Sequence, residues 1–458
     1  WSTRPQKFTQ TILFLQCFIR VRWICWYYLD WMQIIRRDYS GPSFRILKLK
    51  IAIIGGGASG IVTAYLLDSF HQVTLFEKQS ILGGNIRTLN KNVKSNNFSF
   101  KFPLDNGVIE FARDHSPYLN ALMADLKIEL EIITGGATSF FSQDGSYWQS
   151  PGAISKSSKS LIKKYKNYFK LLSLTPDYLI LWGKMKLFGE NILFGKPISN
   201  YLQDQLLSRW YKMLLMYGYS TPYLKVNDFP AEMAFETLTK MNLFTYWNRI
   251  PGGVYRYVEA ILDRFRGKVQ CDVKIDNIVR KSNEVSVNLK SGENLKYDKI
   301  IFATPPDQIL EMLADPTDDE KKRFFEWKGN HISTKIHTDI ELYKKYGVKS
   351  YNEFDVFEGK DGKEAGYNAY LNRLCSVPSK HSNSYFLSFN LDNYINPEKV
   401  IHIQNHHTPL YTPEAIKYRK EVIETNGQNN TYFTGAYLKN GLHEGAISSA
   451  FETAKNLL

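Results

Sequence analysis

Cysteine is scarce in this sequence, and its four copies lie far apart. Cys17, Cys25, Cys271 and Cys375 form no C-x-x-C pair among the 458 residues. Neither a zinc ribbon nor a disulfide framework is therefore indicated. A reducing, cytoplasmic setting is the prediction that follows from this cysteine usage.

The chain also lacks a dense run of basic residues, although its net charge is +13. Nine lysines or arginines and two acids give residues 1–50 a charge of +7, which leaves +6 for the other 408 residues. The sequence contains no basic tract and matches no nucleic-acid-binding motif. We therefore predict that nucleic acid is not a partner.

A long uninterrupted apolar run is missing from the basic, aromatic N-terminal extension, residues 1–46. Arg20, Arg22 and Asp30 interrupt its apolar part, whereas a transmembrane helix needs roughly 20 consecutive apolar residues. A signal peptide is not predicted either, because no small-residue cleavage site follows a charged start. One interpretation of the arginine and tryptophan content is an amphipathic helix that rests on a membrane surface.

The start of the chain supports a second interpretation. The first residue is Trp1 rather than Met, and four of the nine tryptophans lie within residues 1–31. This composition differs from that of the remainder. We therefore favour the view that residues 1–31 are not native protein and that Met32 is the start, with peripheral membrane contact as the alternative.

Beyond the extension, a strand-like apolar run meets a glycine cluster. Residues 49–54 (LKIAII) predict a buried parallel strand, and a G-x-G-x-x-G motif and an apolar-periodic helix follow at once. In such a loop the glycines allow a tight turn and let a pyrophosphate approach the backbone at the helix N-terminus. The predicted nucleotide-binding residues of this loop are Gly55, Gly57, Ala58, Ser59 and Gly60.

An acidic residue follows at the distance expected for ribose recognition. VTLFEK predicts a second strand that ends at Glu77, 22 residues after Gly55, with Lys78 next. A carboxylate there can hydrogen-bond ribose hydroxyls and favours NAD or FAD over NADP. The alternative is a glycine turn with no ligand, but the strand, helix, second strand and acid together favour a dinucleotide site.

Four further segments resemble the FAD-dependent amine oxidases and their phytoene-desaturase-like relatives. After SILGGNIRTL (80–89), which carries Gly83, Gly84 and Asn85, the matching segments are PGGVYRYVEAIL (251–262), the stretch 272–309 with its Ala-Thr-Pro-Pro turn, and the C-terminal segment 432–458. Asn85 departs from the family's usual arginine. The closest resemblance is to the predicted NAD/FAD-binding subgroup of this superfamily. GAY-x-x-x-G-x-HE resembles its ending, and HHTPLYTPEA (406–415) resembles one of its middle segments.

The resemblance implies the fold, the cofactor and more site residues. It implies an α/β fold whose Rossmann-type, glutathione-reductase-like FAD-binding domain is built from the discontinuous segments 47–110, 250–311 and 425–458. An α+β substrate-binding domain would comprise 111–249 and 312–424. The implied cofactor is FAD, with further contacts from Val273, Ala303, Gly435, Glu444, Gly445 and Ala446.

Two residues of the resemblance concern the chemistry. Lys335 aligns with a lysine that holds a water near flavin N5 in many relatives; the alternative is a surface lysine at a strand end. Leu442 follows Gly441, at a flavin-facing position where many amine oxidases carry Tyr or Trp. An aromatic ring can attract an amine through its face, and leucine cannot.

The function predicted from these features is an FAD-dependent oxidoreductase that takes a hydride from a small hydrophobic, lipid- or polyene-like substrate onto flavin N5. The alternatives are an amine oxidase that makes an imine and hydrogen peroxide, and a flavin-binding protein without turnover. A dehydrogenase that uses only NAD is a weaker interpretation. No metal site is predicted, because His443-Glu444 lacks the second histidine of H-E-x-x-H and HIQNHH (402–407) has no acid or cysteine nearby.

Overall fold

The computed structural model describes most of the chain from Leu47 onward. The residues described are 47–133, 137–157, 160–173, 176, 179–180, 183, 190–202, 206–240, 245–359 and 364–458. The predicted N-terminal extension, with Cys17, Cys25 and Met32, lies outside them. No helix in the described part is long and apolar enough to cross a membrane.

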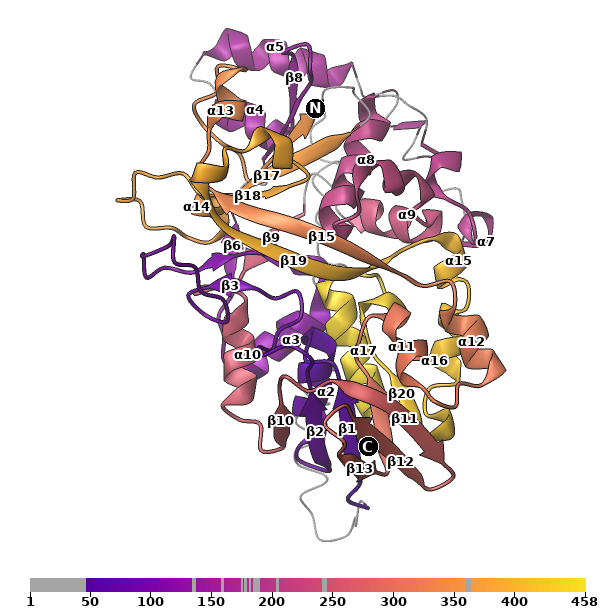
Figure 1. The fold of residues 1–458 in the computed structure, drawn as a ribbon. Coiled ribbons are helices and arrows are strands. Elements are labelled where there is room, and N and C mark those ends of the chain that lie inside the picture. Colours follow the sequence, from indigo (N-terminus) through magenta and orange to yellow (C-terminus); the bar gives the residue numbers. More distant parts are fainter. Residues whose placement is uncertain are drawn as a thin grey trace, which may run out of the picture.

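A five-stranded sheet forms one end of the molecule (Figure 1). Its strand order is β10-β2-β1-β14-β20, and all four pairings are parallel. The strands are β1 (Lys50–Ile54), β2 (Gln72–Phe76), β10 (Lys268–Gln270), β14 (Lys299–Phe302) and β20 (Thr431–Phe433). They come from three distant parts of the sequence, which lie within the segments predicted for the FAD-binding domain.

Alternate side chains of β1 point to opposite faces of this sheet, and both faces are covered by other elements. Ile51 and Ile53 pack with the helices α2 (Ala58–Leu67), α10 (Tyr255–Leu262) and α17 (His443–Lys455). Ala52 and Ile54 belong to the other cluster, together with residues of a three-stranded antiparallel sheet. That sheet is formed by β11 (Ile275–Lys281), β12 (Glu284–Leu289) and β13 (Asn294–Tyr297). A strand buried on both faces is apolar throughout, as LKIAII predicted.

Helix α3 (Pro117–Leu126) differs from the predicted domain division. Residues 111–249 were assigned to the substrate-binding domain, yet Leu119, Leu122 and Met123 are buried in the cluster around Ile51. The helix packs against α10 and α17. Its apolar face therefore completes the core of the FAD-binding domain, a long-range contact that the local pattern does not encode.

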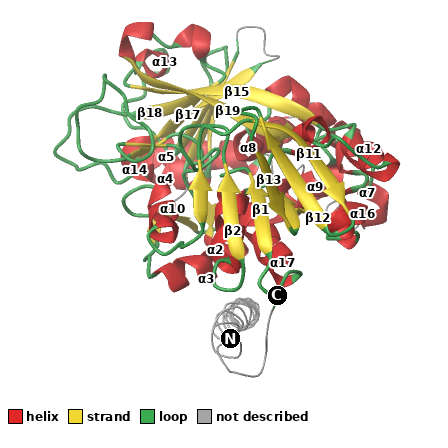
Figure 2. Cartoon of the chain, turned by 60° about the horizontal axis from the view of Figure 1, so that its bottom comes forward, coloured by secondary structure: helices red, strands yellow, loops and turns green. Residues whose placement is uncertain are grey.

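A seven-stranded sheet spans the other half of the molecule, in the order β19-β15-β18-β17-β16-β7-β8. Figure 2 shows the parallel strands β1 and β2 pointing toward it. The long antiparallel pair β15 (Lys328–His337) and β19 (Val400–Leu410) crosses this half. The other strands are β7 (Thr138–Phe141), β8 (Tyr147–Gln149), β16 (Phe354–Glu358), β17 (Ala365–Tyr370) and β18 (Phe386–Phe389).

Helices and smaller sheets surround these two halves. The helices beside the seven-stranded sheet are α4 (Pro151–Ser157), α5 (Leu161–Leu172), α8 (Leu206–Tyr219), α13 (Glu341–Lys344) and α14 (Leu371–Leu374). Helix α9 (Ala231–Lys240) packs against α8 and α7 (Glu190–Leu193). The helices α11 (Ile309–Met312), α12 (Asp318–Phe324), α15 (Pro413–Ile416) and α16 (Arg419–Glu424) lie near the junction of the halves. Two small sheets comprise β3 (Thr88–Leu89), β4 (Leu104–Asp105), β5 (Phe111–Ala112), β6 (Glu131–Ile133) and β9 (Trp247–Arg249).

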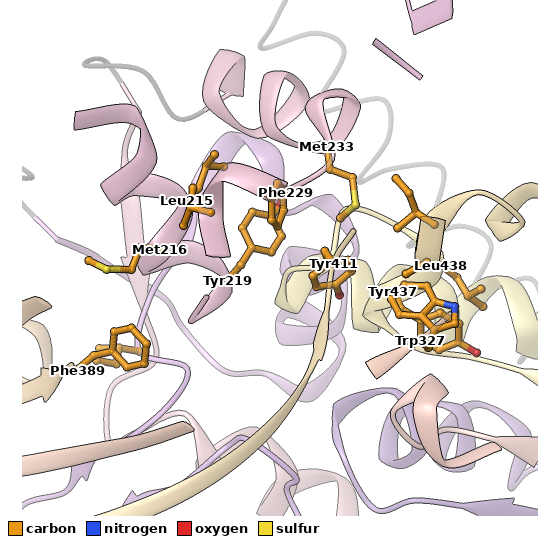
Figure 3. Packing of buried hydrophobic residues seen from close by; sticks show 14 of the residues in the cluster. Leu215, Met216, Tyr219, Phe229, Met233, Trp327, Phe389, Tyr411, Tyr437 and Leu438 are labelled. Carbon is orange, nitrogen blue, oxygen red and sulfur yellow. The ribbon is translucent and has the colours of Figure 1, made fainter. Parts of the chain in front are cut away.

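An aromatic cluster joins α8 and α9 to the end of β19 and the turn before α17 (Figure 3). The ring centroids of Tyr219 and Phe229 lie 4.5 Å apart, and those of Tyr219 and Tyr411 lie 5.6 Å apart. The Tyr219 hydroxyl donates a hydrogen bond to the Asn440 carbonyl oxygen at 2.8 Å. The turn that carries Gly441 is thereby fixed to the helices of the substrate side.

Candidate active site

A cavity of about 830 Å3 lies where the parallel strands end and the seven-stranded sheet begins. Its wall includes Gly55 and Glu77 from the five-stranded side and Tyr367 and Leu387 from the seven-stranded side. The carboxyl ends of parallel strands are where open α/β sheets bind ligands. The position therefore suits a dinucleotide on one side and a substrate on the other.

The first glycine loop shows two different needs for glycine. Gly55 has φ +108°, and a Cβ there would lie 2.8 Å from the Ala303 carbonyl oxygen. A Cβ on Gly60 would lie 1.9 Å from the Gly55 carbonyl oxygen, so Gly60 serves the packing of α2 and is absent from the cavity wall. A Cβ on Gly57 would meet nothing closer than 3.9 Å within the protein.

Gly57 therefore leaves space for a ligand rather than for a neighbouring part of the chain. Gly57, Ala58 and Ser59 line the cavity at the N-terminus of α2. Helix N-termini offer backbone N–H groups and a favourable dipole to phosphate. This arrangement suits a pyrophosphate at Gly57.

Glu77 is buried at the end of β2 and lines the cavity. Its Oε2 accepts a hydrogen bond from Gly56 N at 2.7 Å, and its Oε1 accepts one from Gln79 N at 2.9 Å. Each carboxylate oxygen has a second acceptor site for a ribose hydroxyl. Lys78 also lies in the cavity wall.

The second glycine pair places Gly84 against the first loop. Gly83 and Gly84 both have positive φ, +116° and +56°, and a Cβ on Gly84 would lie 3.0 Å from Gly57 Cα. Gly84 lines the cavity, whereas Gly83 turns the chain behind it. Asn85 lines the cavity too, and its Nδ2 donates to the His407 carbonyl oxygen at 3.0 Å.

Arg87 does not replace the arginine that Asn85 displaces. Its guanidinium points back into its own loop and donates to the Leu82 carbonyl oxygen and to Gln79 Oε1. Burial lowers the pKa of Arg87. No arginine lines the described cavity wall, so the side-chain cations available there are lysines, among them Lys78.

The remaining predicted cofactor residues divide between the wall and the layer behind it. Those in the wall are Val273, Ala303, Gly435, Glu444 and Ala446. Gly445 lies behind the wall, where a Cβ would be 2.4 Å from Asn440 Oδ1. Thr304, from the Ala-Thr-Pro-Pro turn, has a buried hydroxyl in the wall with no hydrogen-bond partner in the described structure.

Glu444 has a structural contact that the sequence did not suggest. Its two carboxylate oxygens accept hydrogen bonds from Tyr118 N at 2.9 Å and Leu119 N at 3.0 Å. These N–H groups belong to the first turn of α3, which has no side-chain cap of its own. Burial raises the pKa of Glu444 to about 8.

Lys335 and Leu442, the two residues predicted to face the flavin, are placed differently. The Lys335 ammonium pairs with Asp392 Oδ1 at 2.5 Å and is not in the cavity wall. The neighbouring Thr334 is buried and contacts Asn106 and His406 instead. No residue of β15 lines the described cavity wall, so the structure does not place Lys335 at the predicted catalytic position. Leu442 lies in the wall.

Glu110, Tyr217 and Tyr367 are among the cavity residues that the sequence did not predict. Glu110 lines the cavity beside Tyr217 and Tyr367, and the Tyr217 hydroxyl donates to Glu110 Oε1 at 3.2 Å. Burial raises the pKa of Glu110 to about 8, so it is mostly protonated at neutral pH. The one local signal was a lone acid within the apolar run GVIEF, which fits a titratable group in an apolar site.

The histidines of HIQNHH make no metal site. His406 Nε2 lies 2.9 Å from Thr334 Oγ1, and burial lowers the pKa of His406 to about 4. His407 lines the cavity and pairs with Asp307 at 2.9 Å. The described residues contain no group of three or more potential metal ligands.

Comparison with known proteins now identifies the family. The sequence profile described as flavin containing amine oxidoreductase matches residues 58–340, more than half of the chain. The chain belongs to this family. Membership makes it an FAD-dependent oxidoreductase, and it confirms the predicted superfamily and cofactor.

Solved structures agree on the fold. Cyclohexylamine oxidase from Brevibacterium oxydans IH-35A matches with a TM-score of 0.66 and 14% identity, over 90% of this chain and 99% of that one. A CLA-producing fatty acid isomerase from P. acnes matches with a TM-score of 0.61 and 15% sequence identity, again over 90% of this chain and 99% of that one. Putrescine oxidase bound to putrescine matches with a TM-score of 0.61 and 13% sequence identity, over 90% of this chain and 99% of that one. A search of curated protein sequences finds no match.

Three observations show that the residues of the cavity wall fit FAD. Gly57 leaves open space at the N-terminus of α2, Glu77 presents a carboxylate, and the Thr304 hydroxyl is buried without a partner in the described structure. The predicted α/β fold with a Rossmann-type domain is likewise confirmed.

Proposed function

We propose that this flavoenzyme removes a hydride from a neutral, hydrophobic substrate, lipid- or polyene-like in character. The observation that carries the proposal is that Leu442 and Glu110, whose pKa burial raises to about 8, line the same cavity. Neither side chain offers a fixed charge near neutral pH. A neutral substrate can therefore enter without leaving a buried charge unpaired.

The residues of the chain mainly bind, orient and exclude water. Leu442, Leu387 and Phe111 supply apolar contact for a hydrocarbon segment. Protonated Glu110 has an O–H that can donate to a carbonyl or hydroxyl of the substrate, while its other oxygen accepts from Tyr217. Such contacts hold the reacting C–H bond in one orientation.

FAD, when bound, supplies the hydride acceptor. In the proposed reaction a substrate C–H bond breaks with both electrons, and the neighbouring carbon loses a proton, which passes out of the cavity to the bulk solvent. A carbon–carbon double bond forms, and the two electrons pass in a second half-reaction to an oxidant such as dioxygen or a quinone. The substrate is thereby oxidised by two electrons, and atoms and charge balance.

The test is anaerobic titration of the purified flavoprotein with two groups of compounds. We expect the methyl ester of a long-chain polyunsaturated fatty acid, or phytoene, to bleach the visible flavin absorbance, and cyclohexylamine or putrescine to leave it unchanged. Bleaching by the amines alone would contradict the proposal.

A second candidate, amine oxidation, is favoured by one observation. The rings of Tyr217 and Tyr367 lie 5.4 Å apart, in an edge-to-face arrangement, in the wall that also holds Glu110. Tyrosine faces and an ionised carboxylate can attract an ammonium group. Tyr217 on α8 and Tyr367 on β17 thus provide the aromatic rings that Leu442 does not provide.

Glu110→Gln separates the two candidates. Glutamine is neutral like protonated glutamate, so kcat/KM for a neutral substrate should change by less than about threefold. An amine would lose a charge-assisted partner, and a contact of about 1.5–3 kcal/mol corresponds to a loss of roughly 10- to 150-fold in kcat/KM. Glu236→Gln is the control, because Glu236 lines the same cavity but pairs with Lys240.

A further inference from the structure

Helix α5 packs on the protein with its polar side and turns its apolar side outward. The Lys164 ammonium donates to the Ser155 carbonyl oxygen at 2.8 Å, and Asn167 Nδ2 donates to Gln149 Oε1 at 3.0 Å. The Lys170 ammonium donates to the Tyr147 carbonyl oxygen at 3.1 Å and lies 4.4 Å from the centroid of the Trp148 ring. Polar contacts therefore fix the inner side of the helix.

The outer side forms a continuous apolar face, which we call the α5 face. Its residues lie on one side of the helix, because their spacing repeats every three or four positions. Their exposed fractions are 70% for Leu161, 79% for Ile162, 68% for Tyr165, 74% for Phe169 and 61% for Leu172. Surface helices of globular proteins normally show the reverse arrangement. Leaving so many neighbouring apolar side chains in water is costly, so a partner is expected.

The charges beside this face select the kind of partner. Lys163 and Lys166 are exposed and border the apolar residues. Residues 145–176 contain six lysines and no aspartate or glutamate. Lysine is depleted at protein–protein interfaces, whereas basic amphipathic helices with aromatic and leucine side chains bind anionic membrane surfaces.

We propose that the α5 face docks this enzyme onto an anionic lipid bilayer surface. The helix lies parallel to the bilayer, with Leu161, Phe169 and Leu172 at the level of the acyl chains. Lys163 and Lys166 contact the lipid phosphates. Figure 1 places α5 at the end of the molecule far from the parallel sheet, so docking leaves the FAD-binding domain facing water. This proposal is independent of the substrate proposed above.

The test is flotation of the full chain with vesicles of phosphatidylcholine, alone or mixed with phosphatidylserine. We expect binding to the mixed vesicles and at least tenfold weaker partition for Leu161→Ser/Phe169→Ser. The matched control is Phe325→Ser/Ile403→Ser, which alters two side chains elsewhere that are 68% and 53% exposed. Lys163→Glu/Lys166→Glu should remove the preference for phosphatidylserine.

Each contrary outcome overturns the proposal. The flavin spectrum and the midpoint of thermal unfolding show that each variant is folded, which the exposed positions favour. If the wild-type chain does not bind the mixed vesicles, the proposal fails. If Leu161→Ser/Phe169→Ser binds as the control does, the contact lies elsewhere in the chain. If light scattering shows a dimer that this variant dissociates, the α5 face binds a second copy instead.

Discussion

Gly57 and Gly60 belong to one motif, yet a side chain at each would meet different surroundings. A methyl group on Gly60 would collide with the Gly55 carbonyl oxygen, whereas one on Gly57 would project toward the cavity without a close contact. Gly57 has φ −82°, which any residue can adopt. Substitution of Gly57 should therefore affect cofactor binding, whereas substitution of Gly60 should affect the packing of the fold.

Gly57→Val should fold but fail to retain FAD. We expect its apo form to unfold within about 2 °C of the wild-type apo protein, because a change in free energy below about 0.5 kcal/mol shifts the midpoint this little. Flavin content after purification should fall at least tenfold. Gly60→Ala should instead lower stability by at least about 2 kcal/mol through overpacking and strain. Normal flavin content in Gly57→Val would show that the pyrophosphate lies elsewhere.

At the residue scale, the sequence predicted contacts that depend on the local backbone and missed those that depend on where a distant strand lies. The glycines and Glu77 lie within one strand–helix–strand unit, where spacing determines position. The error at Lys335 has another cause: no residue of β15 lines the described cavity wall, and the position of this strand depends on pairing with residues far away in sequence. Thr334 faces Asn106, and Lys335 faces Asp392.

At the element scale, Glu444 connects two helices that are far apart in sequence. It is the second residue of α17, and its carboxylate accepts from two N–H groups in the first turn of α3. Buried N–H groups without a partner are costly. The carboxylate thus stabilises the position of α3 in the core of the FAD-binding domain.

Glu444→Ala should lower the free energy of unfolding by about 2–4 kcal/mol, since two buried hydrogen bonds lose their acceptor. Glu444→Gln keeps one carbonyl acceptor and should lose about half of that. Chemical denaturation of the apo proteins measures both, and it excludes any contribution from FAD binding. Equal stability of Glu444→Ala and wild type would contradict the capping role.

The features that the sequence did not predict depend on contacts between residues far apart in the chain. The apolar run LKIAII and the alternation of residues 272–309 identify strands because their burial is periodic in sequence. Whether α3 packs on α17 or on the substrate side depends on contacts more than 300 residues apart, such as Tyr118 with Glu444. The pairing of Glu110 with Tyr217 depends likewise on where α8 lies.

At the scale of the whole molecule, buried acids determine how stability depends on pH. Burial raises the pKa of Asp105 to about 7 and the pKa values of Glu110 and Glu444 to about 8. A raised folded-state pKa stabilises the protein at low pH, and that stabilisation is lost as pH rises through the folded pKa. Buried histidines with pKa values lowered to about 4 act in the opposite direction, but only below about pH 6.5.

Between pH 6.5 and 8 the acids alone should govern the trend, so stability should fall as pH rises. Each acid contributes at most about 1.4 kcal/mol per pH unit while it stays protonated only in the folded state. The midpoint of thermal unfolding, measured at each pH with saturating FAD, reports this trend. The midpoint of Glu110→Gln should fall less steeply with pH than that of the wild type. A midpoint that stays constant or rises over this range would contradict these protonation states.

The central claim is that this family member binds FAD at the carboxyl ends of its parallel strands and oxidises a neutral, apolar substrate there. Anaerobic reduction of the purified protein tests it most directly, with one absorbance reading that reports both cofactor and chemistry. We expect one FAD per chain, bleached by a polyunsaturated fatty acid methyl ester or a polyene and unaffected by amines. A colourless protein, or a flavin that only amines reduce, would contradict it.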